Sequence, residues 1–190
     1  SRGLGDVYKR QGIKINDPSV IVYDSFEEKV KAIGNEAYKM LGKTPDYLTA
    51  IRPINGGNII DYDALEQMVC YYIQKICGNR ILKPSIVACV PSDTSDIDKK
   101  TVTDLLISSG AARACVIEEP LAAALGAGVS MKKPEGVLIV DIGGGTSEVA
   151  VISLRGIVTS RSVRVAGDEF DRSIINFIKK KYLSLIHISE

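Results

Sequence analysis

The sequence is poor in the residues that build metal sites and disulfide frameworks. It contains one histidine, His187, no tryptophan, and four cysteines that form no Cys-x-x-Cys pair. Zinc sites and disulfide frameworks need such residues at short, regular spacings, so the sequence predicts neither. The cysteines lie in apolar segments, and we expect them to be small core residues in a reducing cytoplasm; they are Cys70, Cys77, Cys89 and Cys115.

Long hydrophobic runs and an excess of one charge are also missing. No apolar run approaches the roughly 20 residues of a membrane span, and no signal peptide is recognisable. With 24 Lys+Arg against 23 Asp+Glu, no overall field favours nucleic acid or an anionic membrane. What is present is a chain of 190 residues, 45% of them hydrophobic, which is enough for a substantial core.

Strand and helix patterns alternate along the chain, which indicates an α/β fold. We expect strands within residues 13–23, 85–90, 114–117, 137–153 and 157–165, and a loop between residues 42 and 61. We expect helices at residues 34–41, from Asp61 or Asp63 to Cys77, and at 95–109, 120–125 and 168–182. The second helix carries an apolar stripe that includes Tyr72 and Ile73, for which we favour a core position over a membrane contact.

Three consecutive glycines follow the apolar strand that ends in Val140-Asp141-Ile142. A dinucleotide fold or a P-loop would continue into a helix, whereas here residues 148–153 continue as a strand. The pattern therefore predicts a β-hairpin whose turn, Gly143-Gly144-Gly145-Thr146, can close its backbone N–H groups around an anion. A carboxylate beside a phosphate is repulsive unless a cation separates them, so Asp141 suggests Mg²⁺ held through water. The alternative is a tight hairpin with an ordinary aspartate.

A second acidic motif, Glu118-Glu119-Pro120, lies at a strand-to-helix junction about two dozen residues before the glycines. Acidic residues at this place often only complement the helix dipole. We expect the two strands to belong to one sheet, and therefore expect Glu119 and Asp141 to face one cleft.

These motifs resemble those of the actin and heat-shock-chaperone ATPase superfamily, and most closely the MreB/Mbl family of bacterial actin-like proteins. The resemblance rests on residues 117–128 and 140–153 and extends to shorter stretches at residues 16–20, 40–45, 50–53, 89–92 and 160–171. It implies a partial actin-like (ribonuclease H-like) α/β fold. Its first lobe, with a small insertion subdomain, would span residues 12–152, and its second lobe would begin at residues 153–182.

The resemblance also implies roles for individual residues. Asp141 would hold the Mg²⁺ shell, and the turn Gly143, Gly144, Gly145 and Thr146 would bind the phosphates of ATP. Glu119 would orient or deprotonate the water that attacks the γ-phosphate. The family's first phosphate loop, Asp-x-Gly-Thr, is absent from Ser1–Gln11, and we expect Ser1–Gln11 and Leu183–Glu190 to be foreign sequence.

The function implied is that of a cytoskeletal ATPase in the cytoplasm. Its filaments would assemble by self-association at the inner face of the cytoplasmic membrane and would guide the cell-wall elongation machinery, so setting rod shape, without nucleic acid. Three alternatives stay open, namely a heat-shock-type chaperone ATPase domain, a small-molecule kinase of the same fold, and a structural module with a vestigial site.

We expect the 190-residue chain itself to bind Mg-ATP poorly or not at all, because only one of the surfaces that would enclose the nucleotide is recognisable. Isothermal titration of the chain with Mg-ATP measures this. Binding in the micromolar range would contradict the expectation.

Overall fold

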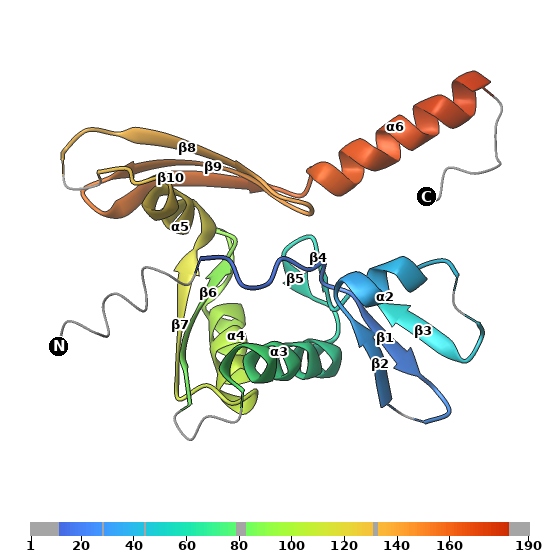
Figure 1. Ribbon diagram of the computed structural model, residues 1–190. Helices are drawn as coiled ribbons and strands as arrows, with labels where there is room; N and C mark the ends of the chain where they lie inside the picture. Colours follow the sequence, from blue (N-terminus) through green and yellow to red (C-terminus); the bar gives the residue numbers. More distant parts are fainter. Residues whose placement is uncertain (1–11, 28, 44, 79–82, 131–132, 183–190) are drawn as a thin grey trace. The chain divides into compact units, whose positions relative to one another are not determined.

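A computed structural model describes residues 12–182, apart from residues 28, 44, 79–82 and 131–132 (Figure 1). The two terminal segments predicted to be foreign sequence lie outside the described residues. Two compact units are present. Unit 1 contains the described parts of residues 12–54 and 59–84, and unit 2 contains residues 55–58 and the described parts of 85–182. Among the described helices, none has the length and hydrophobicity of a membrane-spanning segment.

Unit 1 is built on a three-stranded antiparallel sheet in the order β2-β1-β3. The strands are β1 (Ile21–Asp24), β2 (Lys29–Ile33) and β3 (Leu48–Ile51). The short helix α2 (Asn35–Met40) follows β2, and its Ala37 joins Val20, Val22 and Ala32 in a small buried core. Alternation along β1 explains this packing, because every second side chain of a strand faces the same side.

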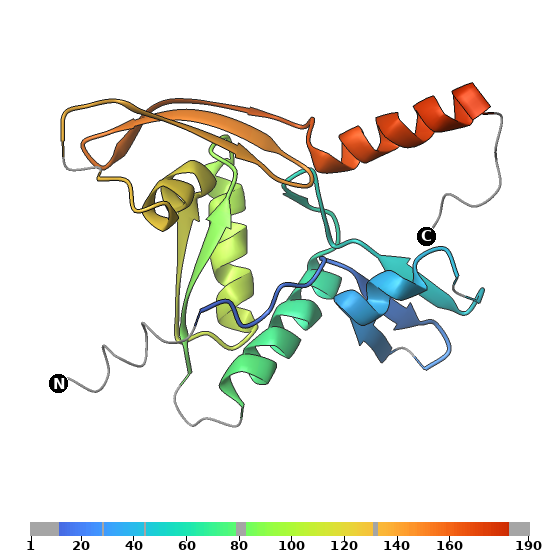
Figure 2. The same ribbon diagram turned by 45° about the horizontal axis from the view of Figure 1, so that its top comes forward.

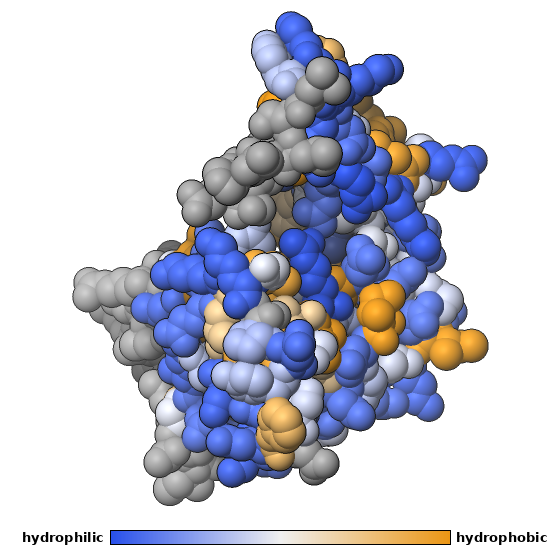
Figure 3. Space-filling model, turned by 90° about the vertical axis from the view of Figure 1, so that its right-hand side faces the viewer, coloured by the Kyte–Doolittle hydropathy of each residue, from blue (hydrophilic) through white to orange (hydrophobic). Residues whose placement is uncertain are grey.

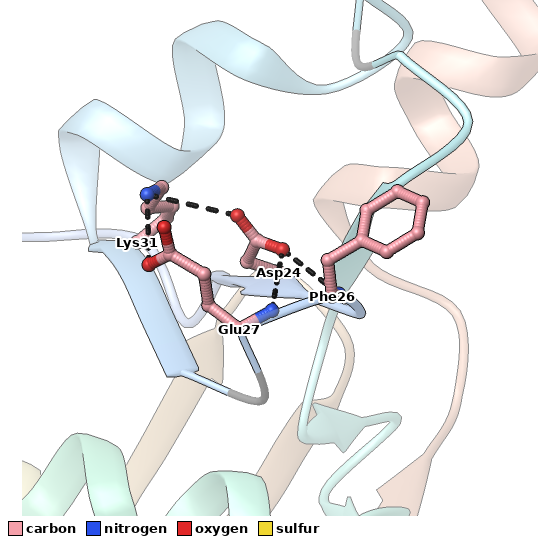
Figure 4. Close-up of polar contacts among 4 residues, drawn as sticks. All are labelled: Asp24, Phe26, Glu27 and Lys31. Atoms are coloured by element: carbon pink, nitrogen blue, oxygen red, sulfur yellow. Dashed lines mark hydrogen bonds and ion pairs between the residues drawn. The ribbon is translucent and has the colours of Figure 1, made fainter.

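The turn between β1 and β2 is organised by the buried carboxylate of Asp24 (Figure 4). Its Oδ1 accepts hydrogen bonds from the backbone N–H groups of Phe26 at 2.9 Å and Glu27 at 3.0 Å. Lys31 Nζ lies 3.6 Å from Asp24 Oδ2 and 3.2 Å from Glu27 Oε2. The Phe26 ring points away from these charged groups and is 83% exposed. Asp24 therefore supplies the hydrogen bonds that the turn backbone would otherwise lack.

The long helix of unit 1, α3 (Tyr62–Cys77), begins as predicted from Asp61. The Asp61 side chain accepts a hydrogen bond from the Ala64 N–H at 2.9 Å, which satisfies one of the unpaired amides of the first turn. Tyr72 is half-buried, and its hydroxyl donates to Asp17 Oδ2 at 3.4 Å. Burial, together with the charge of Asp17, raises the pKa of Tyr72 to about 12. Asn35 also donates to Asp17, so one carboxylate connects α2, α3 and the segment before β1.

Unit 2 begins with a strand-helix-strand unit. The strands β6 (Ser85–Val90) and β7 (Arg113–Glu118) pair in parallel, and α4 (Asp96–Ser108) connects them. Ser95 caps α4, since its Oγ accepts from the Asp98 N–H at 3.2 Å and donates to the Asp98 carboxylate at 2.7 Å. The parallel pairing brings the C-terminal ends of both strands to one edge of the sheet.

The rest of unit 2 is an antiparallel meander in the order β10-β9-β8, with α5 against one face (Figures 1 and 2). The strands are β8 (Val137–Ile142), β9 (Ser147–Ser153) and β10 (Gly156–Val163), and α5 spans Glu119–Gly126. On β9 the buried side chains alternate and are Glu148, Ala150 and Ile152. Helix α6 (Gly167–Tyr182) follows β10, and none of its residues is buried.

A small hairpin lies where the chain passes between the two units. Its strands are β4 (Ile54–Asn55) and β5 (Asn58–Ile59), which pair as a two-stranded sheet. The tip, Asn55–Asn58, is the part that belongs to unit 2. Two glycines with positive φ, Gly56 at 55° and Gly57 at 79°, form the turn.

Three predictions from the sequence are wrong. The strands β7 and β8, which end in the two acidic motifs, belong to two different sheets and not to one. The region predicted as a loop contains the three short strands β3, β4 and β5, and β2 was not predicted, because these strands are too short for a clear alternation. Cys70, Cys89 and Cys115 are exposed rather than buried, and Cys77 is half-buried. Alternation places Cys89 and Cys115 on the outward side of their strands, although the segments around them are apolar.

Many large hydrophobic side chains are exposed on both units. On the face shown in Figure 3, hydrophobic residues stand as separate spots among mainly hydrophilic ones. In unit 2 the exposed residues of β8 alternate with inward-facing ones and are Leu138, Val140 and Ile142. One face of the meander is therefore apolar and uncovered by the described residues, while the other packs on α5.

We predict that Asp24→Asn removes an acid-sensitive part of the stability. The backbone N–H of Glu27 is the main cause that lowers the pKa of Asp24, and Lys31 adds to it. A lowered carboxyl pKa stabilises the fold above the unfolded-state pKa, about 4, and this stability is lost as pH falls through the folded-state pKa. Urea unfolding should therefore show a difference between wild type and Asp24→Asn near pH 6 that shrinks as pH falls below the unfolded-state pKa of about 4.

The matched control is Glu27→Gln, which removes only the exposed ion pair with Lys31 and should change stability little. Equal acid dependence in wild type and Asp24→Asn would show that Asp24 does not contribute in this way.

Candidate functional site

The glycine turn closes the hairpin between β8 and β9. The last strand pair is Ile142 with Ser147, and the Gly143 N–H donates to the Thr146 carbonyl at 2.9 Å. No helix follows the glycines, because β9 continues from Ser147 as predicted. The predicted hairpin is thus confirmed.

The tip of the β4–β5 hairpin lies directly against this turn. A Cβ placed on Gly145 would stand 3.1 Å from the backbone Cα and N of Gly56. A Cβ on Gly57 would stand 2.8 Å from the ring of Pro91 and 3.2 Å from the methyl group of Thr146. Added side chains therefore have no room, at Gly145 because the Gly56 backbone approaches closely and at Gly57 because the side chains of Pro91 and Thr146 fill the space.

The first residues of α6 bind the other side of the turn. The N–H of Gly167 donates to the Gly143 carbonyl at 3.1 Å, and the N–H of Asp168 donates to the Gly144 carbonyl at 2.9 Å. The carbonyl groups of Gly143, Gly144 and Thr146 thereby accept hydrogen bonds. No acceptor among the described residues takes the backbone N–H groups of Gly144, Gly145 and Thr146. The turn therefore offers unpaired donors, which is what an anion site needs.

Two carboxylates stand beside the turn on one face of the hairpin. Asp141 on β8 and Glu148 on β9 are directly opposite in the register, so their side chains share a face. Glu148 is 1% exposed, and its Oε1 accepts from the Ser92 N–H at 2.7 Å and the Ser92 hydroxyl at 2.9 Å. Asp141 is half-buried. Like charges opposite each other are unfavourable, so the pair needs compensation from a donor or a cation.

Glu119 is the first residue of α5, and Pro120 occupies the first turn as predicted. Its neighbour Glu118 forms an ion pair with Lys99 of α4 at 3.0 Å. No cation among the described residues pairs with Glu119, although α5 packs against both β8 and β9. The two glutamates of the motif thus differ, and only Glu119 is left available for a ligand.

The charges of the hairpin carboxylates affect the pKa of Glu119. Partial burial is the main cause that raises the pKa of the Glu119 carboxyl, and the charges of Glu148 and then Asp141 raise it further. The same charges affect Cys89 near the end of β6. Partial burial is the main cause that raises the pKa of its thiol, and the charges of Glu119 and Asp141 raise it further. Glu119 and Asp141 therefore lie within electrostatic reach of each other. A perturbed carboxyl beside unpaired donors is typical of a functional site.

The donor set fits Mg²⁺ held through water better than a directly ligated metal. Among the described residues, no group of three or more His, Cys, Asp or Glu side chains is arranged to hold a metal ion. Asp141 nevertheless faces Glu148 without a described cation beside either group. A hydrated divalent cation would compensate these charges without displacing its own water ligands.

Sequence reasoning missed Glu148, Ser92, Cys89 and Gly56. The register of the predicted hairpin already places residue 148 opposite residue 141, so Glu148 could have been found from alternation. Ser92, Cys89 and Gly56 are brought to the turn only by contacts between elements.

Comparison with known sequences identifies relatives over almost the whole chain. The profile of the family described as MreB/Mbl protein matches residues 6–190. The cell shape-determining protein MreB of Escherichia coli (strain K12) is 42% identical over 184 residues, which cover 94% of this chain and 53% of that protein. The cell shape-determining protein Mbl of Bacillus subtilis (strain 168) is 41% identical over 179 residues, which cover 94% and 54%.

Solved structures agree with the expected fold. MreB5 of Spiroplasma citri bound to ADP superposes with a TM-score of 0.83 at 33% identity, covering 92% of this chain and 53% of that chain. The structure of the MamK double helical filament superposes with a TM-score of 0.75 at 21% identity, covering 94% of this chain and 56% of that chain. This similarity bears on the fold alone. The prediction of a partial actin-like fold is confirmed. The chain spans about half the length of the relatives it matches.

We predict that Gly145→Ala destabilises unit 2, whereas Gly144→Ala, the matched control, does not. The added Cβ at Gly145 would press on the Gly56 backbone at 3.1 Å, while at Gly144 nothing lies within 4 Å. Forced contacts of this kind cost about 1–3 kcal/mol in the free energy of unfolding, measured by urea denaturation. Equal losses for the two variants would mean that the contact with Gly56 is not a constraint.

Proposed function

Because the chain belongs to the MreB/Mbl family, we propose that it is part of a bacterial actin-like cytoskeletal ATPase whose filaments direct cell-wall elongation and rod shape. Relatives named as cell shape-determining proteins support this proposal. A solved relative bound to ADP supports nucleotide use.

The observation that carries the proposal is the turn Gly143–Thr146 with its unpaired N–H groups beside Asp141 and Glu119. Donors arranged around a short turn suit the β- and γ-phosphates of ATP. The carboxylates beside them require a cation, and Mg²⁺ bound to the phosphates would supply the positive charge. We assign Asp141 to the water shell of Mg²⁺ and the turn to the phosphates.

Glu119 is assigned to the attacking water. Its raised pKa makes the carboxylate a better proton acceptor than an ordinary glutamate, which suits a general base. Phosphoryl transfer depends mainly on positioning the water in line with the leaving group, so a half-buried carboxylate on a helix end is well suited to it.

The setting of the reaction is proposed from the resemblance to bacterial actin-like proteins. ATP binding would favour filament assembly, and hydrolysis would depend on the state of the polymer. The filaments would lie in the cytoplasm, peripherally attached to the inner face of the cytoplasmic membrane, with the cell-wall elongation machinery as partner. The chaperone and kinase alternatives are not favoured, because the relatives are named for cell shape.

We predict that Glu119→Ala, in the full-length protein, leaves Mg-ATP affinity within a few-fold of wild type and slows hydrolysis by roughly 10² or more. Single-turnover phosphate release and nucleotide titration measure the two quantities. Glu118→Ala is the matched control, since Glu118 pairs with Lys99 and should be dispensable for hydrolysis. If Glu119→Ala hydrolyses ATP at the wild-type rate, its carboxylate only complements the helix dipole.

The prediction for Asp141→Ala is different, because this change removes the carboxylate that would anchor the hydrated cation. Nucleotide affinity should fall in the presence of Mg²⁺ and change little without it. Titrations of both proteins with and without Mg²⁺ test this. A variant that keeps the full Mg²⁺ dependence would show that the metal is held elsewhere.

A further inference from the structure

Glu148 is the most buried charged side chain among the described residues, and only one of its two carboxylate oxygens accepts hydrogen bonds. Its Oε1 accepts two hydrogen bonds from Ser92, at 2.7 Å from the N–H and 2.9 Å from the hydroxyl. Its Oε2 has no donor among the described residues, although the side chain is 1% exposed. A buried carboxylate oxygen without a partner is costly, so a hydrogen-bond donor is required at this position.

The surroundings restrict what this donor can be. Asp141 lies directly across the strands and Glu119 is within electrostatic reach, and both of these side chains are acceptors and not donors. No lysine or arginine among the described residues forms an ion pair with Glu148. A water molecule is a small donor that several carboxylates attract at once, and it would need space to open beside Oε2, which is fully buried in this structure.

We propose that Glu148 is a positioning residue for ATP hydrolysis: Ser92 fixes one carboxylate oxygen, and the other accepts a hydrogen bond from the water that Glu119 activates. This inference rests on the proposed function. Glu119 takes one proton of the water as its oxygen bonds to the γ-phosphorus and the bond from phosphorus to the ADP oxygen breaks. Glu148 keeps its hydrogen bond to the second proton and takes none.

The position of Ser92 explains why the arrangement would be rigid. Ser92 follows the buried Pro91 at the end of β6, and Glu148 lies in the middle strand of the meander. Two charge-assisted hydrogen bonds thus join the parallel pair of strands to the antiparallel sheet. A water held at this junction would have its place set by both sheets, and not by a mobile side chain.

The decisive variant is Glu148→Gln, assayed in the full-length protein. The amide oxygen can still accept both hydrogen bonds from Ser92, whereas the amide nitrogen would replace the second oxygen and donate instead of accept. We expect single-turnover hydrolysis to slow by about 10- to 100-fold while the Mg-ATP dissociation constant stays within about threefold. If Glu148 had only a structural role, the substitution would not lower the hydrolysis rate while leaving the Mg-ATP dissociation constant unchanged.

Two further measurements use the 190-residue chain and need no nucleotide. In Glu148→Gln the Ser92 amide proton should remain protected from exchange but move upfield in the NMR spectrum, because its acceptor is no longer charged. The thermal midpoint should stay close to that of wild type, which shows that the variant folds. Ser92→Ala, the matched control, loses only the hydroxyl donor and should slow hydrolysis less than Glu148→Gln does.

The outcomes are distinguishable. A folded Glu148→Gln that hydrolyses ATP within about threefold of wild type would overturn the inference, as would equal losses in rate and affinity. If Glu119→Ala hydrolyses ATP at the wild-type rate, the proposed function itself fails. Loss of hydrolysis in Glu119→Ala with normal hydrolysis in Glu148→Gln would reject only the role of Glu148.

Discussion

Close approach of backbones around the turn Gly143–Thr146 is the constraint on which the rest of unit 2 depends. The tip of the β4–β5 hairpin approaches one side so closely that a Cβ at Gly145 would meet the Gly56 backbone at 3.1 Å. The first amides of α6 bind the carbonyl groups of Gly143 and Gly144 on another side. Three segments distant in the sequence therefore meet at one turn. Their contacts use two of its carbonyl groups and leave the N–H groups of Gly144, Gly145 and Thr146 unpaired.

The side chains around this turn are negatively charged, whereas the turn itself presents N–H donors. Asp141, Glu148 and Glu119 interact electrostatically with no described cation among them, while the turn presents unpaired N–H groups. In a folded protein such an arrangement is unfavourable until a ligand supplies both an anion for the amides and a cation for the carboxylates. Magnesium and a nucleotide phosphate together have this composition, which is why we propose Mg-ATP as the ligand of this site. Glu118 lies outside this field because Lys99 neutralises it.

Elements with strong local signals were predictable. The cap at Asp61, the start of α4 at Ser95 and the strand after the three glycines follow from hydrogen-bonding side chains and from periodicity over many residues. The sheet of unit 1 was largely missed, because its strands have four or five residues and its core is shared among several of them. The division between a first lobe ending at residue 152 and a second lobe stays a prediction, as do the roles of the site residues.

The sequence by itself determined the family and the partial actin-like fold, because the motifs that carry them are contiguous and their spacing is local. It also predicted the site residues Glu119, Asp141 and Gly143–Thr146. Only the tertiary structure decided which other groups reach them. The cysteines predicted as core are mostly exposed, since the outward side of a strand is set by what packs on its other face. Glu148 meets Ser92, 56 residues away in sequence, and Gly145 meets Gly56. Such contacts depend on the packing of whole elements, which no local pattern encodes.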